Sequence, residues 1–182
     1  DGVKIACQEK IERDRRKGIL NRPIRAMVVG IPNVGKSTFI NSLAGKTAAK
    51  TGNKPGVTRG NQWIKIDKQL ELLDTPGILW PKFDDDAIGM KLACVGSISD
   101  EVLNMQEIAY HLLSYGQTNY KQLFEARYGA VPQPDDERDN EIVLWMENIA
   151  RQRGCLKRGA ETDFDKVSAQ ITDDFRSGRI GK

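Results

Sequence analysis

The stretch Gly30-Ile31-Pro32-Asn33-Val34-Gly35-Lys36-Ser37-Thr38 decides the expected fold of this chain. An apolar run over residues 24–29 precedes it and is typical of a buried parallel strand, and a helical pattern begins at Lys36. Glycines at these spacings let successive backbone N–H groups turn inward around a phosphate chain, and the helix dipole adds positive potential. The stretch therefore predicts a phosphate-binding loop between a strand and a helix rather than a chance turn.

The same loop predicts roles for single residues. Lys36 is expected to reach the β- and γ-phosphates of a nucleotide, and the Ser37 hydroxyl is expected to bind Mg²⁺. The expected nucleotide-binding residues of the loop are Asn33, Val34, Gly35, Lys36, Ser37 and Thr38.

Two further elements follow in the order and spacing of a nucleoside-triphosphate switch. Thr58 lies in a stretch over residues 51–60 that is rich in Gly and Pro and too poor in apolar residues to pack, so we expect a mobile loop there. Asp74-Thr75-Pro76-Gly77 follows directly on an apolar strand pattern, and the Gly77 N–H is expected to touch the γ-phosphate. The expected metal ligands are Ser37, Thr58 and Asp74, and the expected catalytic set is Lys36, Thr58, Asp74 and Gly77.

Composition fits a globular protein of one or two domains. The 182 residues are 39% hydrophobic and 29% charged, which is ordinary for globular chains. No apolar run approaches the ~20 residues that span a bilayer, so we expect no membrane span. Cys7, Cys94 and Cys155 form no Cys-x-x-Cys pair, which argues against a zinc site or a disulfide framework. Free thiols fit a reducing cytoplasm, where we expect the protein to act.

Charge is distributed unevenly along the chain, although the formal net charge is only +3. Residues 1–50 hold 11 Lys and Arg against 4 Asp and Glu, residues 101–150 hold 3 against 9, and the last 32 residues hold 8 against 5. Basic stretches near both ends are able to follow a nucleic-acid backbone. Solvated helix faces explain them equally well, and charge alone leaves both interpretations open.

Periodicity divides the chain into an α/β part over residues 1–96 and an all-helical part over residues 97–182. In the first part we expect a charged helix over 4–17, strands over 24–29, 62–66 and 70–73, a helix over 36–44, and loop-like chain after Gly77 that includes Asp84, Asp85 and Asp86. In the second part we expect four helices: one after a capping signal at 97–100, one over 120–128, one over 139–153, and one from 162 to 178.

Taken together, the three motifs resemble those of translation-factor-type GTPases. The longer run Leu72-Leu73-Asp74-Thr75-Pro76-Gly77-Ile78-Leu79-Trp80-Pro81 narrows the likeness to the circularly permuted GTPases of the ribosome biogenesis GTPase A (YlqF/RbgA) family. The likeness covers essentially the whole chain, including the basic helix, Pro55-Gly56-Val57-Thr58, Arg127-Tyr128-Gly129 and Arg153-Gly154-Cys155. It implies an α/β P-loop NTPase fold, a permuted G domain that is partial here, followed by an all-α C-terminal domain.

The resemblance also implies a function. It implies a GTPase that binds GTP or GDP with Mg²⁺, drives a late step of large ribosomal subunit assembly, and binds the subunit precursor in the GTP state. Asn33 stands where the resemblance implies K⁺ near the phosphates; a role limited to the loop turn is the alternative. No DNA partner is expected. The basic residues of the helical part that we expect to contact ribosomal RNA are Arg151, Arg153, Lys157, Arg158, Arg176 and Arg179.

Two features of such GTPases are absent from the sequence. The guanine-specificity motif Asn-Lys-x-Asp occurs nowhere, and Asn53-Lys54 lacks its Asp. In the permuted family this motif precedes the phosphate loop, so we expect it in an earlier part of a longer protein, and we expect the sheet here to be incomplete. Ile78 stands where many GTPases carry a Gln that orients the attacking water. The resemblance implies that a polar residue from elsewhere takes this role.

Without a water-orienting side chain, intrinsic turnover is expected to be slow and to be stimulated by the ribosomal particle. The sole histidine, His111, is expected to be structural or exposed rather than catalytic. Two other functions stay open: an RNA-binding placeholder with an idle nucleotide site, and another P-loop NTPase such as an ATPase or kinase.

Overall fold

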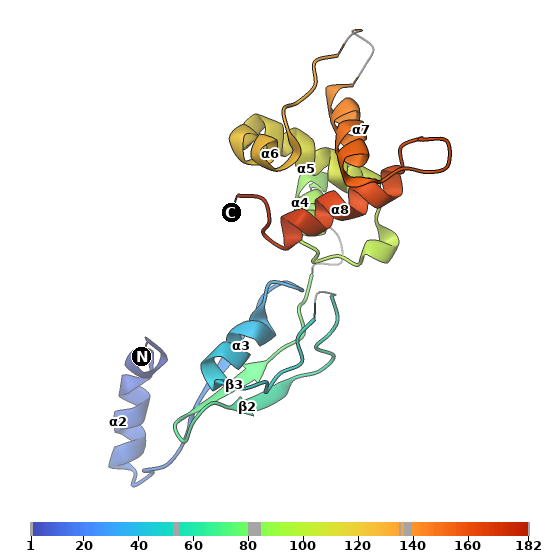
Figure 1. Ribbon diagram of the computed structural model, residues 1–182. Helices are drawn as coiled ribbons and strands as arrows, with labels where there is room; N and C mark the ends of the chain where they lie inside the picture. The colour runs from blue at the N-terminus through green and yellow to red at the C-terminus, as the bar shows by residue number, and fades with distance from the viewer. Residues whose placement is uncertain (1, 53–54, 80–84, 135, 137–139, 182) are drawn as a thin grey trace. The chain divides into compact units, whose positions relative to one another are not determined.

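The computed structural model describes residues 2–52, 55–79, 85–134, 136 and 140–181. The chain divides into two units, Asp1–Lys82 and Phe83–Lys182 (Figure 1). Each unit has its own cluster of buried hydrophobic residues. Several residues singled out above lie outside the described part: Asn53, Lys54, Trp80, Pro81, Asp84 and Asp139.

A three-stranded sheet forms the centre of the first unit. Its strands are β1 (Ile24–Val28), β2 (Gln62–Lys65) and β3 (Leu70–Asp74), in the spatial order β1-β3-β2. β3 is parallel to β1, with Val28 beside Asp74, and antiparallel to β2. The antiparallel pair closes through a tight turn, where the Gln69 N–H donates to Asp67 Oδ1 at 2.6 Å. The three expected strands are thereby confirmed.

One face of this sheet is covered by helix α3 (Lys36–Ala44), which ends at the left-handed Gly45 as expected. Ile40 of α3 packs with Ile64 and Leu72 from the sheet in the core of the unit. On the opposite face, Met27 and Trp63 remain 61% and 48% exposed.

The basic segment before β1 is helical but interrupted. It forms α1 (Gly2–Ala6) and α2 (Gln8–Arg16), separated at Cys7, in place of the single expected helix over 4–17. Neither helix has a buried residue, and helical hydrogen bonds continue across the boundary, from the Cys7 N–H to the Val3 carbonyl and from the Ile11 N–H to the Cys7 carbonyl.

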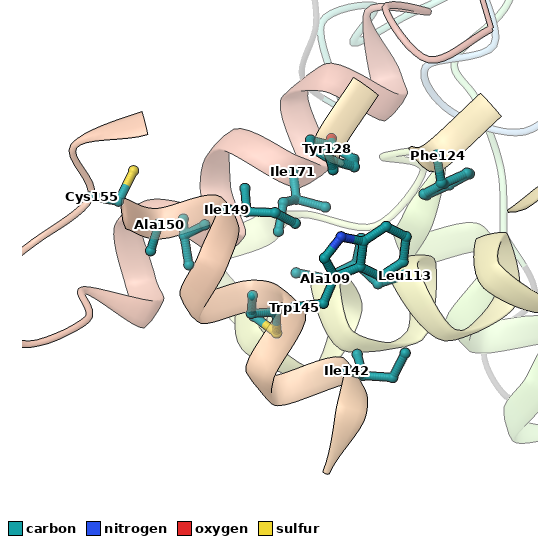
Figure 2. Close-up of a cluster of buried hydrophobic side chains, with 12 residues drawn as sticks. Ala109, Leu113, Phe124, Tyr128, Ile142, Trp145, Ile149, Ala150, Cys155 and Ile171 are labelled. Carbon is teal, nitrogen blue, oxygen red and sulfur yellow. The ribbon is translucent and has the colours of Figure 1, made fainter. Parts of the chain in front are cut away.

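Helices make up the second unit. They are α4 (Asp86–Cys94), a 3₁₀ turn η1 (Asp100–Val102), α5 (Met105–Asn119), α6 (Lys121–Tyr128), α7 (Glu141–Arg153) and α8 (Phe164–Arg176). Figure 2 shows Trp145 of α7 among the apolar side chains of this core, including Leu113 and Ile171. None of the helices of either unit, within the described residues, is long and apolar enough to cross a bilayer.

Two expectations for this region are corrected by the structure. Residues 86–94 were expected to be loop and are helix α4, whose N-terminus is capped by Asp85. The helix expected after 97–100 begins at Met105, where the Asn104 side chain accepts from the N–H groups of Gln106 and Glu107. An asparagine cap of this kind satisfies orphan donors at the helix start.

The expected boundary at residue 96 also differs from the division between residues 82 and 83. The reason lies in α4, which packs on α5 and α8. Ala93 and Cys94 share a buried cluster with Ile108 and Leu112 of α5. Helix α4 therefore belongs to the helical unit.

A buried carboxylate joins three parts of the helical unit. Asp174 of α8 is 2% exposed and accepts hydrogen bonds from Arg127 of α6, at 2.9 and 3.0 Å, and from Arg179 at 3.0 Å. Arg153 of α7 pairs with it at 2.9 Å, and the Tyr128 hydroxyl donates to it at 3.3 Å. Burial pushes the pKa of Asp174 upward, but the bonds from Arg127 and Arg179 and the charge of Arg153 outweigh burial and hold the pKa at about 2.

Asp174→Asn is expected to lower the free energy of unfolding of the helical unit by about 2 kcal/mol, because it removes the charge of a buried carboxylate that Arg127, Arg153 and Arg179 share. Since the pKa of Asp174 is depressed from 3.8, its contribution is fully present above that value and is lost as pH falls towards about 2. Urea unfolding followed by far-ultraviolet circular dichroism, at neutral and acid pH, measures both effects.

The matched control is Asp173→Asn, whose exposed carboxylate pairs with Arg179 at 2.7 Å and accepts from the Ser177 hydroxyl at 3.3 Å. It is expected to change stability by no more than about 0.5 kcal/mol. Equal losses in the two variants would show that Asp174 has no special structural role.

Candidate functional site

Strand register builds the site at one edge of the sheet. Because β1 and β3 are parallel and Val28 lies beside Asp74, the chain leaves both strands at the same edge. The Thr75 hydroxyl donates to the Val28 carbonyl at 2.7 Å and ties the two exits together. The loop before α3 and the segment Asp74–Gly77 are therefore neighbours.

The phosphate loop has the expected backbone shape. Asn33 and Gly35 have φ values of +58° and +88°, the left-handed region that glycine adopts freely and asparagine tolerates. Gly35 is the N-cap of α3, so the first backbone N–H groups of that helix have no intrahelical partner. This is the anion-binding end of a helix.

Lys36 folds back along the loop that precedes it. Its Nζ donates to the carbonyl oxygens of Gly30 and Ile31 at 3.0 and 2.7 Å. An ammonium group has three donors, and the third is available to a phosphate. Burial lowers the pKa of Lys36, and the nearby charge of Asp74 partly opposes that shift.

Three oxygen-bearing side chains meet beside this lysine, as the sequence predicted. Ser37 Oγ donates to Asp74 Oδ2 at 3.0 Å and lies 3.2 Å from Thr58 Oγ1. Thr58 Oγ1 lies 3.4 Å from the same carboxylate oxygen. Asp74 is 2% exposed, and its other oxygen, Oδ1, is buried with no hydrogen-bond partner among the described residues.

These oxygens fit a small hard cation. Mg²⁺ binds oxygen ligands at about 2.1 Å in an octahedron, which puts adjacent ligand oxygens about 3.0 Å apart. The separations of 3.0–3.4 Å match that spacing. The unpartnered Asp74 Oδ1 gives the site an unsatisfied negative atom that a cation or its water would satisfy. Within the described ranges, no cluster of three or more His, Cys, Asp or Glu side chains offers a zinc-type alternative.

A cavity of about 300 Å³ lies over the loop. Its lining includes the expected residues Asn33, Gly35, Lys36, Ser37, Thr38, Thr58 and Gly77. Val34 is not in the lining and its side chain is 51% exposed. Lys50, Thr51 and Gly52 do line the cavity, and sequence reasoning missed them as site residues. Lys50 directly precedes the Gly- and Pro-rich stretch, which was the available signal.

Gly77 approaches the loop as closely as backbone permits. A Cβ built on it would lie 2.5 Å from the Pro32 nitrogen, a distance that real Cβ atoms essentially never show. Only glycine fits here without displacing backbone. The next residue, Ile78, is 76% exposed and has no polar atom in its side chain.

His111 is not one of the residues of this site. It is exposed on α5 of the helical unit. This agrees with the expectation of a structural or exposed residue.

A family model described as 50S ribosome-binding GTPase matches residues 25–131, which include the phosphate loop, Thr58 and Asp74. This chain belongs to that family. The P-loop GTPase fold and the resemblance expected from the motifs are thereby confirmed.

Relatives and solved structures agree with the family assignment. The chain is 49% identical to ribosome biogenesis GTPase A of Priestia megaterium over 179 residues and 47% identical to that of Bacillus cereus, covering 98% of this chain in both alignments. It spans 60% and 59% of the length of these relatives. The GDP-bound structure of TM YlqF matches all of this chain and 75% of its own, with a TM-score of 0.56 and 25% identity. A GNP-bound YlqF structure from T. maritima matches 92% of this chain and 61% of its own, with a TM-score of 0.53 and 28% identity.

For this family member, Gly77→Ala is expected to lower the free energy of unfolding of the first unit by about 1–3 kcal/mol, because the added methyl group must displace the backbone at Pro32. Thermal unfolding of the intact protein measures the change. The matched control is Gly60→Ala, at a position with open space around it, which is expected to stay within about 0.5 kcal/mol of the parent. A Gly77→Ala protein as stable as the control would show that the close contact does not exist in solution.

Proposed function

We propose that this chain forms the phosphate-binding and helical parts of a Mg²⁺-dependent GTPase that drives a late step of large ribosomal subunit assembly in the cytoplasm. One observation carries the proposal: Ser37, Thr58 and Asp74 place their oxygens within 3.4 Å of one another beside Lys36. Membership in the 50S ribosome-binding GTPase family supports guanine nucleotide as the ligand and the large subunit as the partner.

The residues divide the work as follows. The third donor of Lys36 and the free N–H groups at the start of α3 hold the β- and γ-phosphates. Ser37, Thr58 and Asp74 would hold Mg²⁺, which would neutralise the charge that develops on the phosphates. Asn33 shapes the loop turn, and we extend the proposal to a K⁺ ion near it that offsets charge at the phosphates.

Nucleotide state is read through Thr58 and Gly77. Thr58 belongs to the loop that lines the cavity, and Gly77 lies against the phosphate loop. A γ-phosphate contacted by both would order these two segments together, and its loss would release them. The ordered form binds the large-subunit precursor, with ribosomal RNA as a contact, and hydrolysis ends that binding.

The expected rate of intrinsic GTP hydrolysis follows from Ile78. Its exposed apolar side chain has no atom that could orient water by hydrogen bonding. Intrinsic hydrolysis is therefore slow, and a polar group from elsewhere completes the site. An idle nucleotide site is the second candidate function, because the same residue at 78 would also suit a protein that never hydrolyses its nucleotide.

Nucleotide binding tests the core of the proposal. Lys36→Ala is expected to weaken binding of a fluorescent GTP analogue to the full-length protein by about 100-fold, because it removes charge-assisted hydrogen bonds worth about 3 kcal/mol. Lys46→Ala, which removes an exposed lysine outside the cavity lining, should bind like the parent. Competition by ATP as effective as competition by GTP would favour another class of P-loop NTPase.

Hydrolysis tests the mechanism. Phosphate release by the full-length protein with Mg²⁺ is expected to be slow alone, to rise when large-subunit particles are added, and to be faster in KCl than in NaCl. Asp74→Ala should abolish the particle-stimulated rate because the metal loses its carboxylate ligand.

Equal rates with and without particles would contradict stimulation, and equal rates in the two salts would contradict the K⁺ role. Phosphate release by Lys36→Ala and Asp74→Ala at the parent's rate would favour the idle-site function.

A further inference from the structure

Most of the basic residues that sequence reasoning assigned to RNA have structural partners instead. Arg153 and Arg179 pair with the buried Asp174 at 2.9 and 3.0 Å. Arg151 pairs with Glu147 at 3.1 Å, one helical turn away on α7. Carboxylates of the fold hold their guanidinium groups, which lowers the positive field that a polyanion meets.

Arg176 also has partners within the fold. Its guanidinium donates to both carboxylate oxygens of Asp100 at 2.8 Å, and to the carbonyl oxygens of Ala93 and Cys94 at 2.7 and 3.1 Å. Arg176 thus caps the C-terminus of α4 and holds η1 in place. Its role is to join α8 to the preceding helices.

Lys157 and Arg158 differ from these four. They are consecutive and exposed, and neither side chain has a hydrogen bond or ion pair within the part of the chain that the structure describes. Neither contributes to a core or a cap. Two full charges therefore stand next to each other at the surface of the helical unit.

The backbone that carries them is fixed. The Asp163 N–H donates to the Cys155 carbonyl at 2.9 Å, the Lys157 N–H donates to the Glu161 carbonyl at 2.8 Å, and Leu156 pairs with Thr162 between them. Cys155, at the base, is fully buried in the core of the unit. This hairpin over 155–163 is the loop drawn between α7 and α8 in Figure 1.

The hairpin turns through two consecutive left-handed residues, Gly159 and Ala160, with φ values of +88° and +62°. Ala160 pays a steric cost of about 1–2 kcal/mol in this conformation. A tight tip of this kind fixes the backbone that carries the two cations, so binding through them orders little additional backbone.

We propose that this hairpin is an RNA-docking element in which Lys157 and Arg158 contact phosphate groups of ribosomal RNA. The proposal rests on the function proposed above. Duplex RNA is recognised mainly through shape and phosphates, for which exposed cations suffice. The hairpin is less suited to binding a protein, because it offers little apolar surface: the one large apolar side chain exposed among residues 155–163 is Leu156, at 37%. Glu161 lowers the net charge of the tip but forms no described ion pair with either cation.

Binding of the full-length protein to purified large-subunit precursor particles tests the proposal, with a non-hydrolysable GTP analogue present and KCl varied between about 50 and 200 mM. Lys157→Gln/Arg158→Gln is expected to lower affinity about tenfold or more and to reduce the slope of log affinity against log salt by about 2, one unit for each lost phosphate contact. Circular dichroism should be unchanged, because neither side chain has a partner in the fold.

The matched control is Lys65→Gln/Lys68→Gln, which removes two exposed lysines from the β2–β3 hairpin and is expected to bind like the parent. Parent-like affinity of the Lys157/Arg158 variant would overturn the inference and leave the proposed function intact. Lost affinity with an unchanged salt slope would also overturn it, in favour of a protein contact. Failure of the parent itself to bind particles would instead defeat the proposed function, and the docking element with it.

Discussion

The site depends on the parallel pairing of β1 with β3. Their register places Asp74 beside Val28, so the carboxylate that ends one strand lies next to the loop that leaves the other. A shift by one residue would turn Asp74 to the opposite face of the sheet and separate it from Ser37. Ile64 and Leu72 are buried under α3. Their burial opposes such a shift, because the shift would expose these apolar side chains. The apolar core of the first unit therefore sets the geometry of its polar edge.

Local chemistry made the phosphate loop, α3 and the helix stops predictable. Gly35 and Gly45 bound α3 where the sequence indicated, because glycine relieves the steric cost of the left-handed backbone at a helix end. The meeting of Thr58 with Asp74 was predictable for a different reason: motif spacing and family resemblance carry tertiary information that periodicity lacks. Ser37 completes the same constellation from the loop itself.

Roles that depend on distant partners were not predictable. Arg176 looks like any exposed basic residue in the sequence, yet Asp100, 76 residues earlier, makes it a helix cap. The sequence prediction missed helix α4 and treated its residues as loop. The feature that distinguishes them from the preceding loop is their packing against α5, which a sequence does not show. The expected domain boundary differs from the division of the structure into two units for the same reason. For Lys157 and Arg158 the decisive observation is the absence of a described partner, which a sequence cannot show.

The contact between Gly77 and Pro32 gives the first unit a direct mechanical linkage. Both sides of it are main chain, so no rotamer change can absorb a displacement of either segment. A movement at residue 77 must push the turn at residues 31–32, whose carbonyl at Ile31 also holds the Lys36 ammonium. Displacing one backbone segment therefore alters the anchoring of the lysine.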